Sequence, residues 1–311
     1  MKVFVTGGAG QIGSTVADLL LARGDTVLSI DNFSTGRRDN LTPHPALTSV
    51  EGNIVDRELV ERLFDDFKPD VVVHTAASYK DPDDWYSDSL VNAVGTANIA
   101  KACKASKVGK LIYFQTALCY GTNPEQSPIQ LDHPIKPVNS SYAISKTAGE
   151  HYVQFSGVDW TTFRLANVIG PRNVSGPLPI FYKWLSQGRR CFVTTARRDF
   201  CYAGDLAAVV VRSIDGTGTG TYHFSSGRDV AIKQLYDAVV KAMKLNHYPE
   251  PEIRPLGPDE APSILLDPSR TFEDFGEVKF TALDEIVRIA VEHWRTFGVE
   301  GGYSHLRESR G

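Results

Sequence analysis

Residues 1–13, MKVFVTGGAGQIG, join a short β-rich run to the start of a helix through a glycine-rich turn. The glycines that matter are Gly7, Gly10 and Gly13. A turn of this kind lets the backbone adopt unusual angles, approach a pyrophosphate closely and pack the helix tightly on its strand. The N–H groups at the helix N-terminus, which begins with Gln11 and Ile12, then face the phosphates. The stretch therefore predicts a dinucleotide-binding unit that opens at the first residues of the chain.

A carboxylate ends the second predicted strand, at the position that selects the dinucleotide. This strand covers residues 26–30, and Asp31 follows it. A carboxylate there accepts hydrogen bonds from ribose hydroxyls and repels a 2′-phosphate, which favours NAD over NADP. Arg37 and Arg38 lie near enough in sequence to leave NADP open. The following residues are expected to line the same site: Asn32, Phe33, Ser34 and Gly36.

A rival reading of the same glycines is the phosphate loop of nucleoside triphosphatases. Residues 8–15, GAGQIGST, nearly match that loop. The loop requires a lysine after its last glycine to reach the β- and γ-phosphates. Ser14 stands at that position, so the dinucleotide interpretation is favoured.

Strand and helix signals alternate along the first half of the chain. Strands are expected near 3–6, 26–30, 71–73, 111–114 and 161–165, and helices near 11–23, 56–67, 83–106 and 142–155. Strands separated by helices imply a parallel sheet covered on both faces. The fold class is therefore α/β: a Rossmann-type, doubly wound parallel sheet with a smaller, mixed α/β C-terminal substrate lobe.

The second half of the chain is less regular, with Gly and Pro clusters between short helical pieces. We expect residues 1–166 to form the NAD-binding domain and residues 167–311 to form mainly the substrate-binding lobe. Some segments of the second half, about 190–225, are expected to return to the Rossmann sheet.

Composition narrows the possible partners. The chain has 311 residues and a formal net charge of −4, without basic runs, which argues against nucleic acid. No run of 18 apolar residues occurs, so no membrane span is expected and we predict a cytoplasmic protein. The four cysteines have neither CxxC nor zinc-ligand spacing, so we expect free thiols and no metal site.

A tyrosine and a lysine are spaced to share one face of a predicted helix. Residues 140–146 read SSYAISK, which places Tyr142 and Lys146 four residues apart. A phenol normally has a pKa of about 10. A nearby ammonium and the positive nicotinamide ring of NAD⁺ both favour the phenolate. Such a tyrosine can take a proton from a sugar hydroxyl while hydride leaves for NAD⁺.

With these motifs the sequence resembles the extended short-chain dehydrogenase/reductase family, and within it the nucleotide-sugar epimerases and dehydratases. The resemblance covers about residues 1–300. It implies that Thr116, in the segment FQTALCYG at 114–121, assists Tyr142 and Lys146 by binding the reacting sugar oxygen. It adds these cofactor contacts: Asn53, Ile54, His74, Ala76, Ala77 and Asn92.

The resemblance also points to residues on the substrate side. The stretches SYKDPDDW at 78–85 and QTALCY at 115–120 are similar to bacterial surface-polysaccharide sugar epimerases of the WbmG type. The substrate is therefore expected to be a nucleotide-diphosphate sugar. The residues expected to bind it are Lys80, Thr116, Ala117, Leu118, Asn167 and Arg198, with Asn167 and Arg198 on the diphosphate.

The two residues after Thr116 separate the reactions of this family. Dehydratases carry an Asp-Glu pair there, decarboxylating relatives a Glu, and deoxysugar-forming epimerase/reductases a Cys at the second position. Here the residues are Ala117 and Leu118, and Cys119 comes one place late. Because neither side chain can move a proton, hydride removal and return at C4 is the favoured reaction. We expect an NAD-dependent 4-epimerase; a dehydratase or a net NAD(P)-dependent keto-sugar reductase is the alternative.

The substrate, the second diphosphate contact and the oligomeric state have weaker signals in the sequence. The sugar and the nucleotide base are not fixed by any motif. A second diphosphate-binding arginine, common in the family, aligns near Gly257, with Arg254 three residues earlier. By family analogy, the helices at 83–106 and 142–155 are expected to pair in a homodimer.

Overall fold

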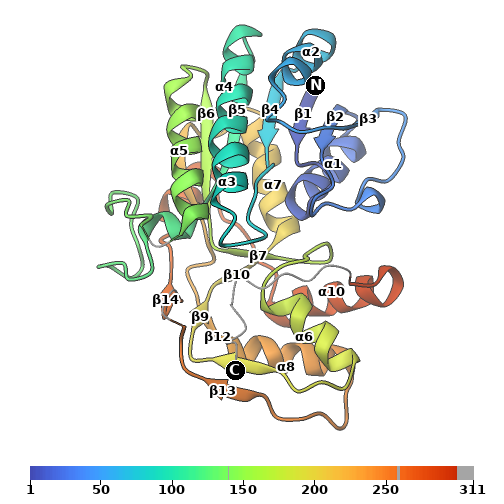
Figure 1. Cartoon of the computed structure of the whole chain (residues 1–311), viewed down its shortest axis with the longest axis vertical. Coiled ribbons are helices and arrows are strands. Elements are labelled where there is room, and N and C mark those ends of the chain that lie inside the picture. Colours follow the sequence, from blue (N-terminus) through green and yellow to red (C-terminus); the bar gives the residue numbers. More distant parts are fainter. Residues whose placement is uncertain (139, 258–259, 300–311) are drawn as a thin grey trace.

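The protein is built around one seven-stranded sheet in which every strand pair is parallel. The computed structural model describes residues 1–138, 140–257 and 260–299. Figure 1 shows the sheet with helices on both sides. Its order is β3 (Leu47–Glu51), β2 (Thr26–Asp31), β1 (Lys2–Thr6), β4 (Val71–His74), β5 (Lys110–Thr116), β6 (Trp160–Leu165) and β11 (Gly220–Phe224).

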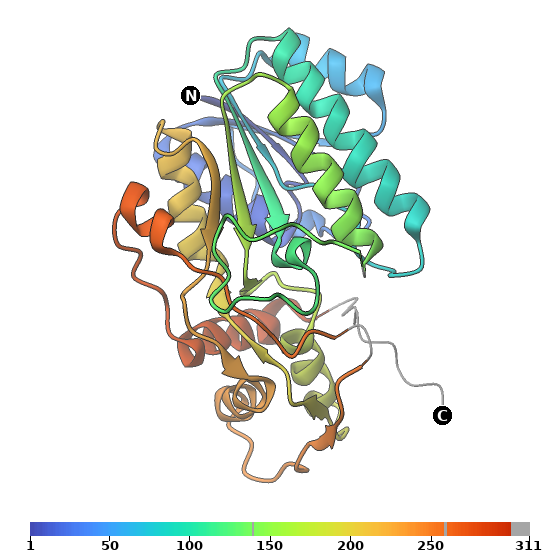
Figure 2. The same ribbon diagram turned by 90° about the vertical axis from the view of Figure 1, so that its left-hand side faces the viewer.

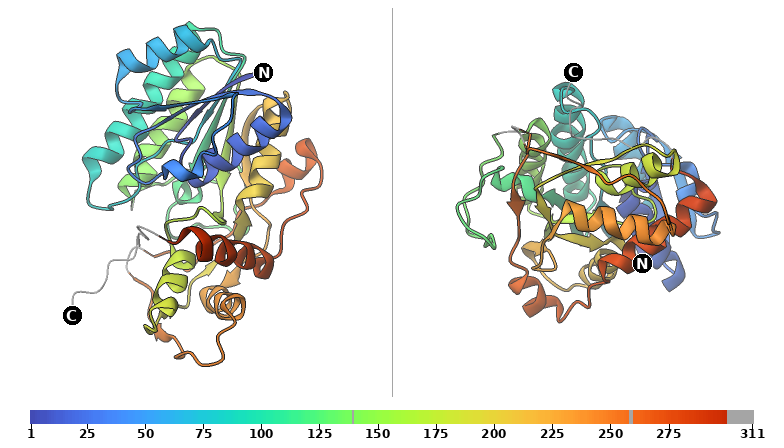
Figure 3. Two further views of the ribbon diagram at one scale, coloured as in Figure 1. Left: turned by 90° about the vertical axis from the view of Figure 1, so that its right-hand side faces the viewer. Right: turned by 90° about the horizontal axis from the view of Figure 1, so that it is seen from below.

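The strands are apolar on both faces because helices cover both faces. In β4, Val71 and Val73 join the core under α1 (Gln11–Arg23) and α7 (Ala203–Ile214), whereas Val72 joins the opposite core. That second core lies under α2 (Arg57–Phe67), α4 (Thr96–Ala105) and α5 (Ser141–Phe155). The left view of Figure 3 shows α1 and α7 on their side of the sheet. The predicted doubly wound α/β fold is confirmed.

The predicted helix at 83–106 is divided into three parts. α3 (Trp85–Asp88) is followed by a π-helical segment, η2 (Ser89–Gly95), and then by α4. Asn92 lies within the π-helical segment and is fully buried. Such segments occur often near functional sites because they redirect a side chain.

A smaller lobe lies beyond the carboxyl ends of the sheet strands (Figures 1 and 2). Its core is formed by α6 (Pro177–Ser186), α8 (Ile232–Met243) and α10 (Leu283–Phe297). Short strand pairs complete it: β7 (Asn167–Ile169) with β10 (Phe200–Tyr202), β8 (Phe192–Thr194) with β13 (Glu252–Arg254), and β9 (Arg197–Arg198) between β12 (Val230–Ala231) and β14 (Ser263–Ile264). The remaining elements are η1 (Arg38–Asn40), η3 (Ala117–Tyr120) and α9 (Ser269–Phe275).

The chain does not enter the lobe only once. α7 and β11 come after the first lobe segments, yet they belong to the sheet layer, and Phe275 of α9 joins the core beneath α7. β8 and β9, by contrast, stay in the lobe. The boundary expected at residue 166 stays a prediction, and residues 300–311 of the expected lobe lie outside the described residues.

Local signals explain several element ends. Gly24 ends α1 in the left-handed conformation with φ of +89°. Asp56 begins α2 by accepting a hydrogen bond from the N–H of Leu59 at 3.0 Å. Among the described residues, no helix combines the length and the apolar character that crossing a membrane requires.

Replacing the α2 cap tests this account of the fold. Asp56→Ala removes the acceptor for the Leu59 N–H, and we expect the free energy of unfolding in urea to fall by about 1 kcal/mol. Asp65→Ala, at an exposed position inside the same helix, is the control and should change little. Equal losses in the two variants would contradict the cap.

Candidate functional site

A cleft of about 1190 Å³ runs along the carboxyl ends of the sheet strands and is closed on one side by the lobe. Ligands bind at this edge in open α/β sheets because loops and helix N-termini converge there. Pockets for a single small ligand usually measure about 300–1,000 Å³. The cleft therefore has room for a dinucleotide and a second ligand beside it.

The glycine loop forms one wall of the cleft through contacts between backbones. A Cβ on Gly7, whose φ is +65°, would lie 2.6 Å from the backbone nitrogen of Ala76. A Cβ on Gly13 would lie 2.4 Å from the carbonyl oxygen of Gly7. Side chains are thus excluded where the loop meets β4, which is the cradle that a pyrophosphate needs.

Gln11 offers a polar group at the start of α1. Its Oε1 accepts a hydrogen bond from Asn173 Nδ2 at 3.2 Å, while its buried Nε2 has no partner among the described residues. Both residues line the cleft. An unpartnered donor beside a glycine cradle suits an anionic cofactor group. The residues present therefore fit a dinucleotide.

Asp31 is held in place before any ligand arrives. Its Oδ2 accepts from the N–H of Ala9 at 2.9 Å, and its Oδ1 accepts from the N–H of Phe33 at 2.8 Å. Burial raises the pKa of its carboxyl, and the backbone hydrogen bonds act in the opposite direction. The side chain remains part of the cleft wall, where it can accept from ribose hydroxyls.

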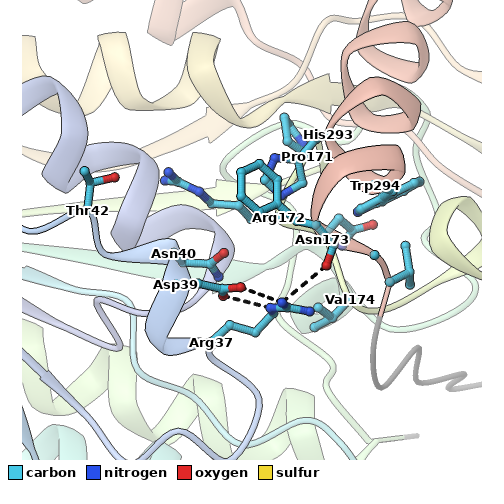
Figure 4. A pocket seen from close by; sticks show the side chains of 13 residues that line it. Arg37, Asp39, Asn40, Thr42, Pro171, Arg172, Asn173, Val174, His293 and Trp294 are labelled. Carbon is cyan, nitrogen blue, oxygen red and sulfur yellow. Dashed lines mark hydrogen bonds and ion pairs between the residues drawn. The ribbon is translucent and has the colours of Figure 1, made fainter.

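The two arginines that left NADP open are both paired with carboxylates. Arg37 pairs with Asp39 at 2.5 Å in a separate cavity of about 160 Å³, bordered by Arg172 and His293 (Figure 4). Arg38 pairs with Glu51 at 2.6 Å. Neither arginine belongs to the cleft lining, although the Arg38 guanidinium lies 4.0 Å from the centre of the Phe33 ring. Because both guanidinium groups are paired with carboxylates and Asp31 faces the cleft, the site favours NAD over NADP.

Thr116, Tyr142 and Lys146 come together in the cleft from two elements. Thr116 ends β5, and its Oγ1 accepts from the N–H of Leu118 at 3.2 Å. Ser140 begins α5 by accepting from the N–H of Ala143 at 3.3 Å, which places Tyr142 in the first turn. Lys146, one turn later, lies with its Nζ 4.0 Å from the centre of the Tyr113 ring. The three predicted residues thus line the same cleft.

In the polypeptide alone, the pKa values of Tyr142 and Lys146 differ from those expected when NAD⁺ is bound. Burial raises the pKa of Tyr142 well above its ordinary value, and the nearby Tyr79 and Asp88 act in the same direction. Burial lowers the pKa of Lys146 to about 7. The polypeptide alone therefore disfavours the phenolate, and a further positive charge is needed to stabilise it.

The cleft contains most of the predicted site residues. They are Gly7, Gly10, Gln11, Ile12, Asp31, Asn32, Ser34, Asn53, Ile54, Ala76, Ala77, Lys80, Thr116, Tyr142, Lys146 and Asn167. The remaining ones are not part of its lining: Gly13, Phe33, Gly36, His74, Asn92, Ala117, Leu118 and Arg198.

His74 and Asn92 support the wall from behind. His74 is fully buried between the hydroxyls of Thr6 and Thr96, at 2.6 and 2.9 Å, and burial lowers its pKa to about 3. Asn92 bonds to both the N–H and the carbonyl of Ser78 at 2.8 Å, and to Ser145 Oγ at 3.0 Å. These contacts fix the loop after β4 against α5.

Of the residues predicted to contact the diphosphate, one lies on the cleft and the arginines do not. Asn167 lies on the cleft, but Arg198 donates to the carbonyls of Arg197 and Ala261 at 2.7 and 2.8 Å. Arg254 pairs with Glu252 at 2.9 Å and stacks on Phe192 in the lobe. The structure therefore does not bring either arginine to the cleft surface.

Four residues of the lobe that line the cleft were not predicted from the sequence. Asn173, Ser175, Pro177 and Phe200 all line the cleft. The Gly and Pro cluster at 170–179 was the one signal in that region, and it indicates only a loop. Their meeting with Gln11 depends on long-range packing that no local pattern encodes.

A glycine cradle, a ribose-facing carboxylate and a Tyr–Lys pair at one edge of a doubly wound sheet define a dinucleotide-dependent enzyme. The model of the NAD dependent epimerase/dehydratase family matches residues 3–223. The chain belongs to this family, which confirms the predicted resemblance and NAD as the cofactor.

Known structures and sequences agree with this assignment. The chain is 65% identical to the Bordetella bronchiseptica enzyme WbmH in complex with NAD⁺, with a TM-score of 0.94 over 96% of this chain and 99% of that one. It is 42% identical to WbmG of the same organism in complex with NAD and UDP, with a TM-score of 0.90 over 98% of each chain. It is 33% identical to a UDP-glucose 4-epimerase of Mycolicibacterium smegmatis, over 95% of this chain and 99% of that protein.

The backbone cradle predicts a sensitive position. In Gly13→Ala the new Cβ would press on Gly7, and overpacking of this kind costs about 1–3 kcal/mol. We expect NAD affinity to fall by about tenfold or more, measured by calorimetry on protein stripped of cofactor. Gly257→Ala, in an open part of the lobe, is the control. Unchanged affinity in Gly13→Ala would disprove the cradle.

Proposed function

We infer that the protein is an NAD-dependent nucleotide-sugar 4-epimerase. Family membership supports NAD-linked chemistry on a sugar nucleotide, and a curated relative at 33% identity is a UDP-glucose 4-epimerase. The reaction is an oxidation at C4 followed by reduction from the opposite face. It has no net redox change, so the same NAD serves successive turnovers.

The observation that carries this proposal is the pair Ala117 and Leu118 directly after Thr116. They lie in the 3₁₀ turn η3 and pack with a small apolar cluster that includes Cys119 and Ile129. A dehydratase needs an acid and a base at this place, and two apolar side chains provide neither. Cys119 is fully buried, and burial raises the pKa of its thiol, so it does not replace them.

The catalytic roles follow from the chemistry of the three clustered side chains. Bound NAD⁺ supplies the hydride acceptor and, after reduction, the hydride donor. Tyr142 takes the proton of the C4 hydroxyl and later returns it to the other epimer. Lys146 keeps a positive charge beside the phenol and binds the nicotinamide ribose, and Thr116 binds the C4 oxygen. Lys80 and Asn167 hold the sugar and the diphosphate from the facing walls.

We propose UDP as the nucleotide of the substrate. The support is the likeness to WbmG, which has been crystallised with NAD and UDP, together with relatives named for UDP-glucose. A role in surface-polysaccharide synthesis and a cytoplasmic location stay predictions from resemblance.

Tyr142→Phe tests the function directly. Wild-type protein should interconvert the C4 epimers of a UDP-hexose, tried as UDP-glucose, UDP-N-acetylglucosamine and UDP-glucuronic acid. The variant should lose about 10²–10⁴-fold in kcat, because proton transfer is removed, and should retain its NAD. Tyr248→Phe, in the lobe, is the control. Accumulation of a 4-keto-6-deoxy product, or steady consumption of added NADH, would overturn the epimerase.

We further propose that the protein forms a homodimer through α3, η2, α4 and α5. These helices lie side by side on one face (Figures 1 and 2). They expose large apolar side chains: Trp85, Tyr86, Val94, Ile144, Tyr152 and Phe155, the last of them 84% exposed. Apolar residues gathered on one surface commonly mark an interface, here with a second copy of the chain.

A charge placed in this surface tests the dimer. Phe155→Glu should yield monomers in sedimentation velocity experiments at concentrations where the wild type is dimeric, because a buried carboxylate is costly. Ile253→Glu, exposed on β13 of the lobe, should leave the dimer intact. A monomeric wild type would refute the proposal.

A further inference from the structure

A buried carboxylate lies one helical turn beyond Lys146. Glu150 is fully buried, and its position four residues on puts it on the same face of α5. No step of the proposed reaction uses it. A buried charge is costly unless it is paired and hydrogen-bonded, so its contacts show what holds it there.

Glu150 receives hydrogen bonds from two neighbouring strands. Its Oε2 accepts from Gln115 Nε2 at 3.0 Å, and its Oε1 accepts from Arg164 Nη2 at 3.1 Å. Gln115 of β5 and Arg164 of β6 are direct partners in the sheet register. Their side chains therefore leave the same face of the sheet and meet α5 together.

Gln115 carries the connection into the candidate catalytic site. While its amide nitrogen donates to Glu150, its Oε1 accepts from the N–H of Thr116 at 2.8 Å. The side chain of Tyr113, two residues earlier on the same face of β5, contacts Lys146 twice. Its hydroxyl donates to the Lys146 carbonyl at 2.9 Å, and its ring lies under the ammonium. The contacts of Gln115 and Tyr113, which are both on β5, thus connect Thr116 to Lys146 through buried side chains.

The ion pair is anchored at its far side as well. Arg164 Nη1 donates to the Tyr120 hydroxyl at 2.7 Å, and that oxygen lies 2.6 Å from His223 Nε2. His223 Nδ1 lies 2.9 Å from the carbonyl oxygen of Asp267. Arg164 is therefore held from two directions, and it presents Glu150 with a fixed partner.

We propose that Glu150 is a positioning residue of the hydride-transfer site: with Gln115 and Arg164 it fixes Thr116 relative to Lys146 and keeps the lysine charged. The inference rests on the proposed function, which gives Thr116 and Lys146 their catalytic roles. It assigns the buried ion pair a role in aligning and charging the site in addition to joining α5 to the sheet.

The charges around Lys146 determine the expected sign. Lys146 interacts with Glu150 on its own helix, Tyr113 on β5 and the neutral His74 on β4. The Arg164 cation pairs with Glu150 from β6, and Tyr142 interacts with Tyr79 and Asp88. Burial lowers the pKa of Lys146 to about 7, and Glu150 acts against that lowering. Removing the carboxylate charge should lower the pKa further, so Lys146 would lose its proton at a lower pH.

The test compares two variants that separate charge from alignment. In Glu150→Gln we expect the alkaline limb of the kcat–pH profile to move to lower pH by about one unit, with KM and bound NAD unchanged. In Gln115→Met, which breaks the link to Thr116 but keeps the ion pair, we expect kcat to fall about tenfold without a shift of that limb. Glu61→Gln, an exposed carboxylate paired with Arg57 on α2, is the matched control.

A second measurement keeps the proposal independent of the substrate. Trace labelling of the purified protein with acetic anhydride across pH, read by peptide mass spectrometry, gives the pKa of Lys146 directly. Should Glu150→Gln fail to fold, Glu150→Gln/Arg164→Met removes both charges and leaves no unpaired guanidinium, so the Lys146 titration should shift in the same direction but by less. An unshifted Lys146 titration in a folded variant overturns the charge role, and wild-type kcat in Gln115→Met overturns the alignment role. A wild type that epimerises no sugar defeats the proposed function, while the labelling result still decides the role of Glu150.

Discussion

The contact between the glycine loop and the end of β4 sets the geometry of the whole site. Gly7 meets Ala76 backbone to backbone, and Gly13 meets Gly7 in the same way. Thr75 reinforces the junction by donating from Oγ1 to the carbonyl of Thr6 at 2.6 Å. These contacts place the N-terminus of α1 directly above the sheet edge. Because the neighbouring strands are locked in register with β1 and β4, their last residues are placed by the same constraint.

Around this junction the site is built in layers. The residues facing the cleft rest on a second set that never reaches it: His74 between two threonines, Asn92 against Ser78, and Glu150 against Gln115. Each member of this second set is buried and makes at least two polar contacts, so the surface residues have little freedom to move. The wall is accordingly pre-formed in the polypeptide. In the polypeptide alone the pKa of Tyr142 stays raised, so the positive charge of the bound cofactor is needed in addition to that of Lys146.

Local chemistry explains what could be predicted from the sequence. α1 and α2 begin and end where their capping and apolar patterns indicate, and Thr116, Tyr142 and Lys146 line one cleft because strand ends and first helical turns gather at one edge. The features that the sequence did not predict share a different cause. The burial of His74, the turning of Arg198 toward Ala261 and the entry of Asn173 into the wall depend on contacts between residues far apart in sequence. A resemblance identifies which position matters, but side-chain direction follows from packing that the pattern does not contain.

The path of the chain between the two layers has a mechanical consequence. It leaves the sheet after β6, returns for α7 and β11, leaves again for β12 and α8, and returns once more for α9 before α10. The two layers are thus connected by several separate segments of the chain and not by a single linker. A protease that cuts one of these connections would leave the two layers joined by the others. Because each layer is built from several separate segments of the chain, neither layer could be expressed alone as one contiguous sequence. Unfolding of one layer should therefore destabilise the other.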